Sequence, residues 1–452
     1  MHSPSVSIVG AGLCGSLLSI MFAKRGIRSC VYDRQQDPRY SQVSAGRSIN
    51  LAMSARGMRA LRHAGLLEQV EPLLLAMRGR LIHKENGATE LQPYGQRPHE
   101  QIFSVSRAAL NRILVAAACE RFGVTMRFGQ EVTSYDPHKG QCTVKNVDDS
   151  STYTITNGPM IGADGAGSCL RRAFAADSYI SPVESLLPHS YKELSIPAGP
   201  GGRFQLATGA LHVWPRGGFM LIALPNPGGD FTLTLFLPND GHSSFAALDS
   251  AAAVSEFFKR HFRDVMPLIP DLTETFAENP VGILGTVRCR HWHIGGDLLL
   301  IGDAAHAVVP FHGQGMNLAF EDCVVLDEIL ARGGQNWSTT FEIFENRQLA
   351  NANAIADMAL ENYVEMRDTV RDPGFLLRKA LAFELERRLP GQFIPRYSMV
   401  MFHDEIPYAE AQQRGALQQA LLEDLTKNAR SLDDIDLAAA ERRVAQLLSA
   451  NL

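Results

Sequence analysis

Residues 5–15 read Ser-Val-Ser-Ile-Val-Gly-Ala-Gly-Leu-Cys-Gly, an apolar run that ends in the pattern Gly-x-Gly-x-x-Gly. A helical pattern follows over residues 16–25, and a second apolar run over residues 28–32 ends at Asp33. Strand, tight turn, helix, strand and acid, in this order, form the context in which the glycine pattern binds a dinucleotide. The glycine pattern alone would be weak evidence, whereas the complete unit predicts nucleotide binding.

Each glycine of the pattern has a physical role in such a unit. Gly10 allows the sharp turn, Gly12 lets the backbone approach a pyrophosphate, and Gly15 lets the helix pack closely against the strand. The helix N-terminus offers unpaired N–H groups and a partial positive charge to phosphates. The stretch therefore predicts an anchored diphosphate, with Asp33 placed to accept hydrogen bonds from the adjacent ribose.

Two later strands also end in an acidic turn. Residues 160–163 lead into Asp164, and residues 297–301 lead into Asp303. The carboxyl ends of parallel strands meet at one crevice of an open sheet, so we expect both acids near the glycine turn. Either acid by itself could equally be a carboxylate that caps a turn. A ligand touched by all these segments and by the glycine-rich loop at 313–315 must be long, which favours FAD over NAD.

Composition and charge limit the classes of partner. The 452-residue chain is 45% hydrophobic and 20% charged, with a net charge of -5, which argues against a nucleic-acid partner held by a basic surface. Seven scattered cysteines without a Cys-x-x-Cys pair predict reduced thiols and no metal site. The chain shows neither a leader pattern nor a run of eighteen apolar residues, so we expect a cytoplasmic protein without a membrane anchor.

The patterning predicts an α/β protein with a Rossmann-like FAD-binding domain, an antiparallel-sheet substrate domain and a C-terminal helical region. The substrate domain is indicated by three apolar or alternating runs of strand length, separated by Pro and Gly turns. The expected boundaries are 1–77, 102–178 and 292–370 for the FAD-binding domain (the last with a long helix), 78–101 for an excursion into the substrate domain, 179–291 for the substrate domain itself, and 371–452 for the helical region.

Local periodicity predicts the elements inside these boundaries. Strands are expected over residues 211–214, 219–224 and 231–237, in addition to those named above. The other expected elements are helices over residues 53–64, 67–77, 104–122, 318–331, 338–368, 374–388, 407–426 and 431–449, a hairpin between 131–135 and 142–147, and a turn at 91–95.

Seven further segments carry distinctive residue combinations. They read Gly-Arg-Ser-Ile-Asn-Leu-Ala at 46–52, Met-Arg-Gly-Arg at 77–80, Leu-Gln-Pro-Tyr-Gly at 91–95, Tyr-Lys-Glu-Leu at 191–194, Pro-Phe-His-Gly-Gln-Gly-Met-Asn at 310–317, Glu-Asn-Tyr-Val-Glu-Met at 361–366 and Phe-Ile-Pro-Arg-Tyr-Ser at 393–398. With the flavin motifs, they resemble the kynurenine 3-monooxygenase family, within the class A single-component FAD aromatic hydroxylases. The resemblance extends from about residue 5 to about residue 402.

The resemblance implies that FAD, NADPH and O2 convert L-kynurenine to 3-hydroxykynurenine through a flavin C4a-hydroperoxide. No catalytic side chain is expected, because the flavin carries the chemistry and the protein must hold the ring and exclude water. No second Gly-x-Gly-x-x-Gly unit marks a nicotinamide site, so the residues leave NADPH and NADH open, and the family favours NADPH. The expected partner is a small aromatic amino acid, and the expected assembly is a monomer or a homodimer.

The resemblance also assigns residues to sites. Arg80, Tyr94, Asn362 and Tyr397 match the family's binding site for the substrate carboxylate, and Glu365 lies one helical turn after Asn362. By itself Arg80 would be read as a solvated surface charge. The matched apolar ring pocket consists of Leu211, Ile222, Leu224, Phe236, Pro310, Phe311, His312 and Met366. The expected cofactor site consists of Gly10, Gly12, Leu13, Gly15, Asp33, Arg34, Arg107, Asp164, Gly302, Asp303, Gly315, Met316 and Asn317.

Two alternatives stay open from the sequence. The first is a related flavin hydroxylase that acts on a ring-substituted kynurenine or an anthranilate-like compound in secondary metabolism, since scattered apolar residues would sense a ring substituent. The second is a protein that binds flavin without turnover. The presence of residues for both ends of a substrate site speaks against the second.

Overall fold

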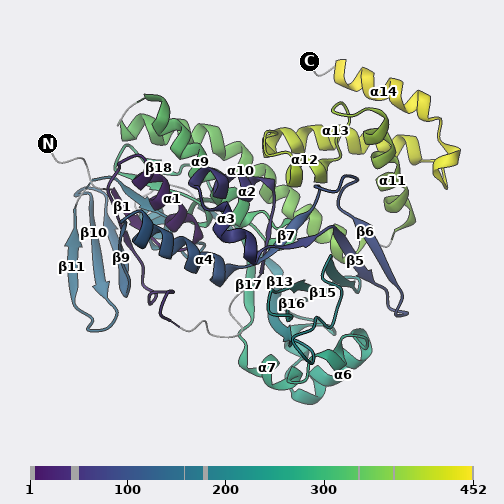
Figure 1. Cartoon of the computed structure of the whole chain (residues 1–452), viewed down its shortest axis with the longest axis horizontal. Helices are drawn as coiled ribbons and strands as arrows, with labels where there is room; N and C mark the ends of the chain where they lie inside the picture. The colour runs from purple at the N-terminus through teal and green to yellow at the C-terminus, as the bar shows by residue number, and fades with distance from the viewer. Residues whose placement is uncertain are drawn as a thin grey trace. The chain divides into compact units, whose positions relative to one another are not determined.

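The computed structural model describes residues 6–41, 50–156, 158–176, 182–333, 336–369 and 372–449. The chain forms two compact units, each assembled from three segments (Figure 1). Unit 1 consists of Met1–Leu74, Ser104–Leu187 and Ile283–Ala356. Unit 2 consists of Leu75–Phe103, Pro188–Gly282 and Asp357–Leu452.

Unit 1 is built on a six-stranded sheet in the order β18-β19-β12-β1-β2-β8, parallel except at β18. The register pairs Val9 of β1 with Gly162 of β12, and Gly162 with Leu300 of β19, so these strands end at the same edge. The expectation that the three strand ends share one edge is confirmed. The strands are β1 (Val6–Val9), β2 (Ser29–Tyr32), β8 (Thr125–Arg127), β12 (Met160–Gly162), β18 (His293–Ile294) and β19 (Leu298–Leu300).

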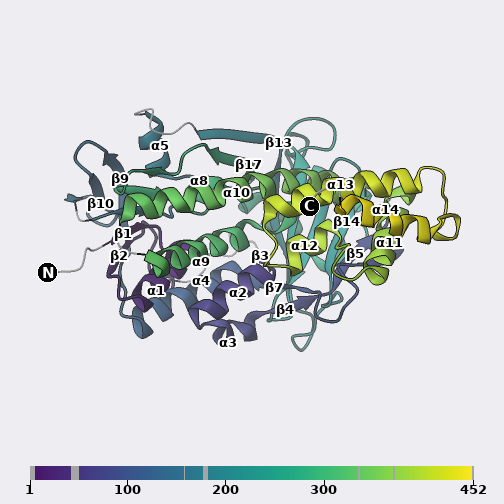
Figure 2. The same cartoon turned by 90° about the horizontal axis from the view of Figure 1, so that it is seen from above.

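Helices cover this sheet, and one of them is buried on nearly all sides. The first helix, α1, buries nine of its twelve residues, as expected for a helix enclosed by other elements. Figure 2 shows α9 beside α1 and α2. The helices of unit 1 are α1 (Leu13–Lys24), α2 (Ala55–Ala64), α3 (Leu67–Val70), α4 (Arg107–Ala116), the π-helix Ala117–Arg121, α5 (Cys169–Ala176), α8 (Asp303–His306), the 3-10 turn Pro310–His312, α9 (Gly315–Gly333) and α10 (Trp337–Arg367), which continues into unit 2.

The expected hairpin of unit 1 is confirmed, and a third strand extends it. The strands β9 (Gln130–Asp136), β10 (Gln141–Asn146) and β11 (Thr152–Ile155) pair antiparallel in the order β11-β10-β9. Two further strands, β3 (Asn50–Met53) and β7 (Ile102–Ser106), precede α2 and α4.

Unit 2 is built on the strands β13-β16-β15-β14-β5-β6 of a seven-stranded sheet, so its three expected strands are confirmed. Neighbouring strands are antiparallel except for β14 and β5, which run parallel and join segments distant in sequence. The strands are β4 (Leu75–Met77), β5 (Gly79–His83), β6 (Thr89–Pro93), β13 (Pro182–Ile196), β14 (Leu211–Pro215), β15 (Met220–Pro225), β16 (Phe231–Pro238) and β17 (Gly282–Cys289), of which β13 and β17 run from one unit into the other.

The two faces of this sheet have different roles. One face carries an apolar core with Trp214, Leu233 and Leu235, which is closed by the helix residues Phe258 and Phe276. A separate core lies between the C-terminal helices. The helices of unit 2 are α6 (Ala251–His261), α7 (Leu272–Glu278), α11 (Pro373–Arg388), α12 (Arg396–Phe402), α13 (Tyr408–Thr426) and α14 (Leu437–Ser449), with 3-10 turns at Phe245–Ala247, Met266–Leu268 and Leu432–Asp434.

Several predicted boundaries near residues 67–122 are wrong. The helix expected at 67–77 ends early: a 3-10 turn with Pro72 follows α3, Leu74 is extended, and β4 begins next. Proline lacks the N–H that a continuing helix needs. The helix expected at 104–122 begins only at Arg107, because residues up to Ser106 belong to β7 and the Ser106 hydroxyl caps the helix by accepting from Ala109 N. The turn expected at 91–95 is instead largely strand, since β6 continues to Pro93.

Later boundaries also differ. The helix expected at 318–331 begins three residues earlier, at Gly315. The last helix begins at Leu437, and a capping box formed by Ser431 and Asp434 isolates the 3-10 turn before it. The patterns missed α6, α7 and α12, because short amphipathic helices between strands or loops give little periodic signal.

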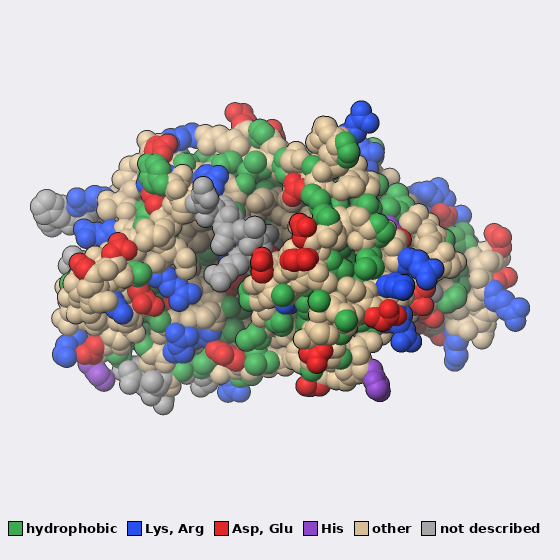
Figure 3. Space-filling view, turned by 90° about the horizontal axis from the view of Figure 1, so that it is seen from below, with side chains coloured by type: hydrophobic (Ala, Val, Ile, Leu, Met, Phe, Trp, Pro, Cys, Tyr) green, Lys and Arg blue, Asp and Glu red, His purple; other side chains and the backbone are tan. Residues whose placement is uncertain are grey.

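The surface of the protein carries charges of both signs. Figure 3 shows acidic and basic side chains interspersed over one face, in keeping with 43 Lys and Arg against 48 Asp and Glu. All seven cysteines are free thiols. Over the described ranges, no helix is long and apolar enough to cross a membrane, and no cluster of three or more metal-ligating side chains occurs.

A buried polar chain joins β5 and β14. His212 Nε2 lies 2.7 Å from the Ala207 carbonyl, which can only accept, so this nitrogen carries the proton. Its Nδ1 then accepts from His83 Nε2 at 2.9 Å. His83 Nδ1 lies 3.1 Å from an oxygen of Asp264, which also accepts from Trp214 Nε1 at 2.7 Å. Burial lowers the pKa of His212 to about 4, so the ring is neutral in the folded protein at neutral pH.

These hydrogen-bonded histidines predict that the stability of the folded protein falls in acid. Unfolded His212 takes up a proton below about pH 6.5, whereas the folded ring does so only near pH 4. The unfolded state therefore binds more protons in this window, and the free energy of unfolding should fall on acidification by up to about 1.4 kcal/mol per pH unit. His212→Gln keeps a donor for the carbonyl and cannot titrate, so its stability should depend less on pH. Urea denaturation of both FAD-loaded proteins at pH 7 and pH 5, followed by tryptophan fluorescence, measures the difference; identical pH dependence would contradict the assignment.

Candidate functional site

The glycine turn of unit 1 has no room for side chains. Gly10 adopts a φ of +104°, and a Cβ there would collide with the Ala163 carbonyl. A Cβ at Gly15 would collide with the Gly10 carbonyl. In contrast, nothing lies within 4 Å of a Cβ position at Gly12. Gly12 is the N-cap residue just before α1 and provides no side-chain cap. The first N–H groups of the helix, which lack intrahelical partners, therefore border open space suited to a diphosphate.

Asp33 is held at this turn by backbone donors. Its two carboxylate oxygens accept from Ala11 N at 2.6 Å and from Gln35 N at 2.7 Å. Burial raises the pKa of Asp33 above its ordinary value. Each oxygen keeps lone-pair capacity for a ribose hydroxyl. Leu13 is buried in the first turn of α1, and Arg34 is exposed beside the acid.

The two later acids differ in their partners. Asp164 Oδ2 accepts from Cys169 N at 2.8 Å and so caps α5. This is the turn-capping role that the sequence offered as an alternative to ligand binding. Asp164 Oδ1 is buried without a partner among the described residues, so one oxygen is available to a ligand. Asp303 begins α8 and makes no hydrogen bond or ion pair within the described chain. Gly315 lies beside it, with its Cβ position 4.0 Å from Asp303 Oδ1.

A fully buried carboxylate, Asp322 of α9, fixes the turn that carries Asp303. It accepts from Gly302 N at 3.1 Å, from His306 Nε2 at 2.6 Å and from Gln348 Nε2 at 2.9 Å. Burial alone would lower the pKa of His306, but the Asp322 carboxylate outweighs it and the pKa is raised. The carboxylate thus holds both ends of α8, through the Gly302 N–H and the His306 ring. Sequence reasoning missed Asp322, although an acid within the apolar run of α9 is a usable signal.

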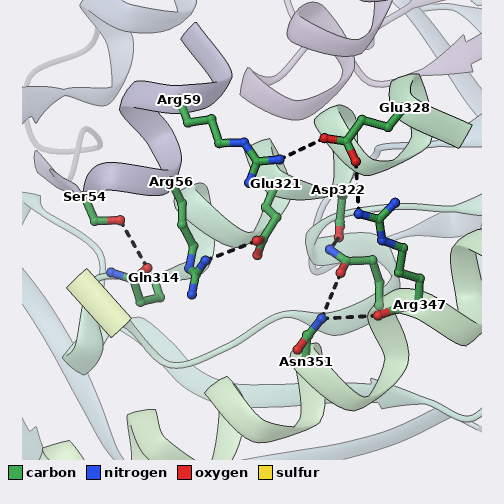
Figure 4. A network of polar contacts seen from close by, with 10 residues as sticks. Ser54, Arg56, Arg59, Gln314, Glu321, Asp322, Glu328, Arg347 and Asn351 are labelled. Carbon is green, nitrogen blue, oxygen red and sulfur yellow. Dashed lines mark hydrogen bonds and ion pairs between the residues drawn. The ribbon is translucent and has the colours of Figure 1, made fainter. Parts of the chain in front are cut away.

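Further ion pairs fasten α9 to its neighbours (Figure 4). Arg56 of α2 lies 3.2 Å from Glu321. Glu328 lies 2.8 Å from Arg59 of α2 and 3.0 Å from Arg347 of α10. These pairs hold in place the helix whose first residues form the glycine-rich loop.

The expected cofactor residues near this loop have different surroundings. Asn317 is fully buried, and its amide is engaged: Nδ2 donates to the Ala52 and Gly313 carbonyls, each at 2.8 Å, and Oδ1 accepts from Ser54 N at 3.0 Å. Its side chain therefore shapes the loop. Met316 is buried, Gly315 begins α9, and Arg107 is exposed at the start of α4.

In unit 2, the five polar residues expected to bind the head group come together. Arg80 projects from β5, and Nη1 lies 2.7 Å from Glu365 Oε1 while Nη2 donates to Asn362 Oδ1 at 3.1 Å, both on α10. The guanidinium carbon lies 5.9 Å from the ring centre of Tyr94 and 5.3 Å from that of Tyr397. The two rings stack on each other at 5.2 Å. Segments from four parts of the chain thus enclose one guanidinium.

The electrostatics of this cluster suit an anionic ligand. Arg80 is 5% exposed, and its Nε is buried without a partner among the described residues. Burial alone would lower the pKa of this guanidinium, but Glu365, Tyr397 and Tyr94 together outweigh it and the pKa is raised. Burial raises the pKa of Tyr94 to about 12 and also raises that of Tyr397, so both phenols keep their protons at neutral pH. The site thus offers one unsatisfied cationic donor and two hydroxyl groups.

The sheet register decides where the expected apolar residues point. Leu211 pairs with Arg80, and the pairs that continue across the sheet place Ile222, Leu224 and Phe236 on the same face as Arg80, opposite the α6 and α7 core. Met366 lies one turn after Asn362, whose Nδ2 is 3.4 Å from its sulfur. The remaining three, Pro310, Phe311 and His312, belong to unit 1, where Phe311 and His312 are buried in a 3-10 turn before α9.

The chain is similar to known proteins over most of its length. The sequence profile of a family described as an FAD binding domain matches residues 4–185 and 274–357, more than half of the chain. Kynurenine 3-monooxygenase of Myxococcus xanthus strain DK1622 is 46% identical over 448 residues, covering 99% of this chain and 95% of the relative. The enzyme of the same name from Stenotrophomonas maltophilia strain K279a is 47% identical over 446 residues, covering 98% and 97%.

Solved structures show the same fold at low sequence identity. The tetrameric form of 2-methyl-3-hydroxypyridine-5-carboxylic acid oxygenase gives a TM-score of 0.66 at 18% identity, over 85% of this chain and 98% of that one. CtdE, solved with FAD and a substrate, gives 0.66 at 15% identity, over 94% and 100%. The FAD binding domain and the relatives that match nearly the whole chain define an FAD-dependent monooxygenase. Within that class, the chain belongs to the kynurenine 3-monooxygenase family.

The role of Asp322 predicts the effect of its replacement on FAD affinity. Asp322→Asn keeps one acceptor for the Gly302 N–H but removes the charge opposite His306, so the turn that carries Asp303 should loosen. We expect the FAD dissociation constant to rise about tenfold or more, from about 1–3 kcal/mol of lost hydrogen bonding. Fluorescence titration of the apoprotein with FAD measures this. Glu328→Gln removes a carboxylate of the same helix with partly exposed partners and should keep FAD affinity within a few-fold; wild-type affinity in Asp322→Asn would refute the role.

Proposed function

We propose that this chain hydroxylates L-kynurenine to 3-hydroxykynurenine with bound FAD, NADPH and O2. The observation that carries the proposal is the buried Arg80 guanidinium, surrounded by two phenols, an amide and a carboxylate, with one unsatisfied N–H. This arrangement suits the carboxylate of an amino acid, because a guanidinium fork pairs with carboxylates through two parallel hydrogen bonds. Relatives named kynurenine 3-monooxygenase that match nearly the whole chain support the choice of amino acid.

The head-group cluster can bind both charges of a zwitterion. The incoming carboxylate competes with Glu365 for Arg80, and Glu365 is then placed to accept from the α-ammonium group. The neutral phenols of Tyr94 and Tyr397 supply hydroxyl donors to the carboxylate oxygens. Leu211, Ile222 and the other apolar residues on the same sheet face suit the aromatic ring, which they would shield from water.

Unit 1 has the residues that FAD requires. The start of α1 suits the diphosphate, Asp33 suits the adenosine ribose, and the free carboxylate of Asp303 suits a hydroxyl of the ribityl chain. When bound, FAD accepts a hydride from the nicotinamide cofactor and delivers one oxygen atom of O2 to the substrate. The aniline amino group of kynurenine makes its ortho position electron-rich, so the protein need not supply a nucleophile. The chain's own task is to orient the ring and keep water away from it.

Product analysis tests the proposed function. The FAD-loaded protein is incubated with L-kynurenine and O2, and with NADPH or NADH in parallel, and the product is identified by chromatography and mass spectrometry. We expect 3-hydroxykynurenine and NADPH oxidation that is accelerated by L-kynurenine. Ring-methylated kynurenine and anthranilate serve as competing substrates. Faster turnover of either compound would favour the secondary-metabolism alternative. NADPH oxidation that none of the three compounds accelerates would contradict hydroxylase function.

Removing the Arg80 guanidinium should weaken substrate binding and leave FAD binding unchanged. Arg80→Ala should raise the Michaelis constant for L-kynurenine about 100-fold, equivalent to about 3 kcal/mol of charge-assisted hydrogen bonding, at unchanged FAD content. Arg80→Lys keeps the charge without the planar fork and should give an intermediate value. Steady-state kinetics and the flavin-to-protein absorbance ratio measure both effects. Arg430→Ala, a change at an exposed arginine, is the control, and a wild-type Michaelis constant in Arg80→Ala would refute the assignment.

A further inference from the structure

One face of α11 packs on the loop that carries Tyr94. Lys379, Phe383 and Glu386 are spaced at i, i+4 and i+7, which places them along one side of this helix. Gln96 Nε2 donates to the Phe383 carbonyl at 2.9 Å and to Glu386 Oε2 at 2.8 Å. This face therefore lies against the segment just after Tyr94, with Lys379 on the same side one turn before Phe383.

Lys379 is a partly buried cation without a partner. It makes no hydrogen bond or ion pair within the described residues, and its contact is with the Phe383 ring, whose centre is 5.7 Å from Nζ. The two acids that act on it electrostatically are engaged elsewhere: Glu365 pairs with Arg80 at 2.7 Å, and Glu90 pairs with Lys84 at 2.6 Å. Burying an unpaired ammonium group is costly, and such groups are normally paired.

The ammonium group of Lys379 is electrostatically coupled to the head-group cluster. Burial lowers the pKa of Lys379 to about 8, and the repulsion from Arg80 acts in the same direction. Glu365 and Glu90 oppose the shift without cancelling it. A lysine that only projected into solvent would lose little hydration and would feel Arg80 weakly. Arg80 and Lys379 therefore repel each other and are both attracted by Glu365, an arrangement that an added anion would relieve.

We propose that Lys379 is a second cation for the α-carboxylate of the amino-acid substrate, acting beside Arg80. The inference rests on the proposed function, because it takes the head-group cluster as the place where the carboxylate binds. Arg80 supplies the directional fork, and Lys379 supplies a mobile point charge on a flexible stem. The carboxylate would balance the two cations when Glu365 turns to the α-ammonium group.

The proposal has a consequence for pH. In the ligand-free enzyme, Lys379 loses its charge as the pH rises through about 8. The facing groups Arg80 and Tyr94 do not titrate with it, because their pKa values are raised. Affinity for the carboxylate should therefore fall above about pH 8 in the wild type. Lys379→Arg, which stays charged, should lose this dependence.

A ligand comparison tests the inference. L-Kynurenine and the corresponding amine without its carboxylate are titrated into the oxidised, FAD-loaded enzyme, and binding is read from the flavin absorbance spectrum. Lys379→Met should weaken binding of L-kynurenine about tenfold (about 1.4 kcal/mol) and binding of the amine less than about twofold. Lys379→Arg should stay within about threefold of the wild type for both ligands. Lys427→Met, which removes an exposed lysine from the same helical region, is the charge-matched control.

The outcomes separate this inference from the proposed function. Equal weakening of both ligands in Lys379→Met would mean a structural role, and unchanged affinity for both would mean a solvated lysine; either result overturns the inference while leaving the hydroxylase reaction intact. Wild-type enzyme that binds L-kynurenine but forms no hydroxylated product would overturn the proposed function, and the same ligand comparison would still decide the role of Lys379. Wild-type enzyme that does not bind L-kynurenine would overturn both.

Discussion

Three parallel strands that end in register are the constraint on which unit 1 depends. Because Val9, Gly162 and Leu300 are aligned, the turns that follow them meet at one edge of the sheet. The close approach of these turns leaves no room for a Cβ at Gly10. The same approach brings a helix N-terminus and several carboxylates to one edge, where we propose that they bind FAD. The buried Asp322 then keeps the last of these turns in place.

Unit 2 is organised around a charge that the chain alone only partly satisfies. Arg80 lies on a strand with one sheet face against an apolar core, and its guanidinium projects from the other. Burying it requires acceptors, and the chain supplies Glu365 and Asn362 from α10. Its Nε has no partner among the described residues, which is costly for a buried group, and we propose that a ligand completes the shell. An incomplete hydrogen-bond shell is thus a sign of the site.

The agreement between sequence patterns and structure follows the range of the interactions involved. The first strand, turn and helix are governed by neighbouring residues and were predicted closely. Proline at position 72 ended a helix whose apolar periodicity continued, and strand β6 overrode a turn signal through pairing with β5. The sequence pattern leaves capping and ligand binding as alternatives for Asp164. In the structure one oxygen caps α5, and the other has no hydrogen-bond partner among the described residues.

The sequence by itself determined the nucleotide turn, the alternation of strands and helices, and, through family resemblance, which residues to expect at the head group. Only the tertiary structure decided that Arg80 is buried and paired with Glu365, 285 residues later, and that Asp322 holds the turn of Asp303. It alone revealed that Lys379 contacts the Phe383 ring and has no ion-pair partner among the described residues. The physical reason is that burial and ion pairing depend on segments brought together by the sheet, whereas periodicity and turn chemistry are properties of adjacent residues.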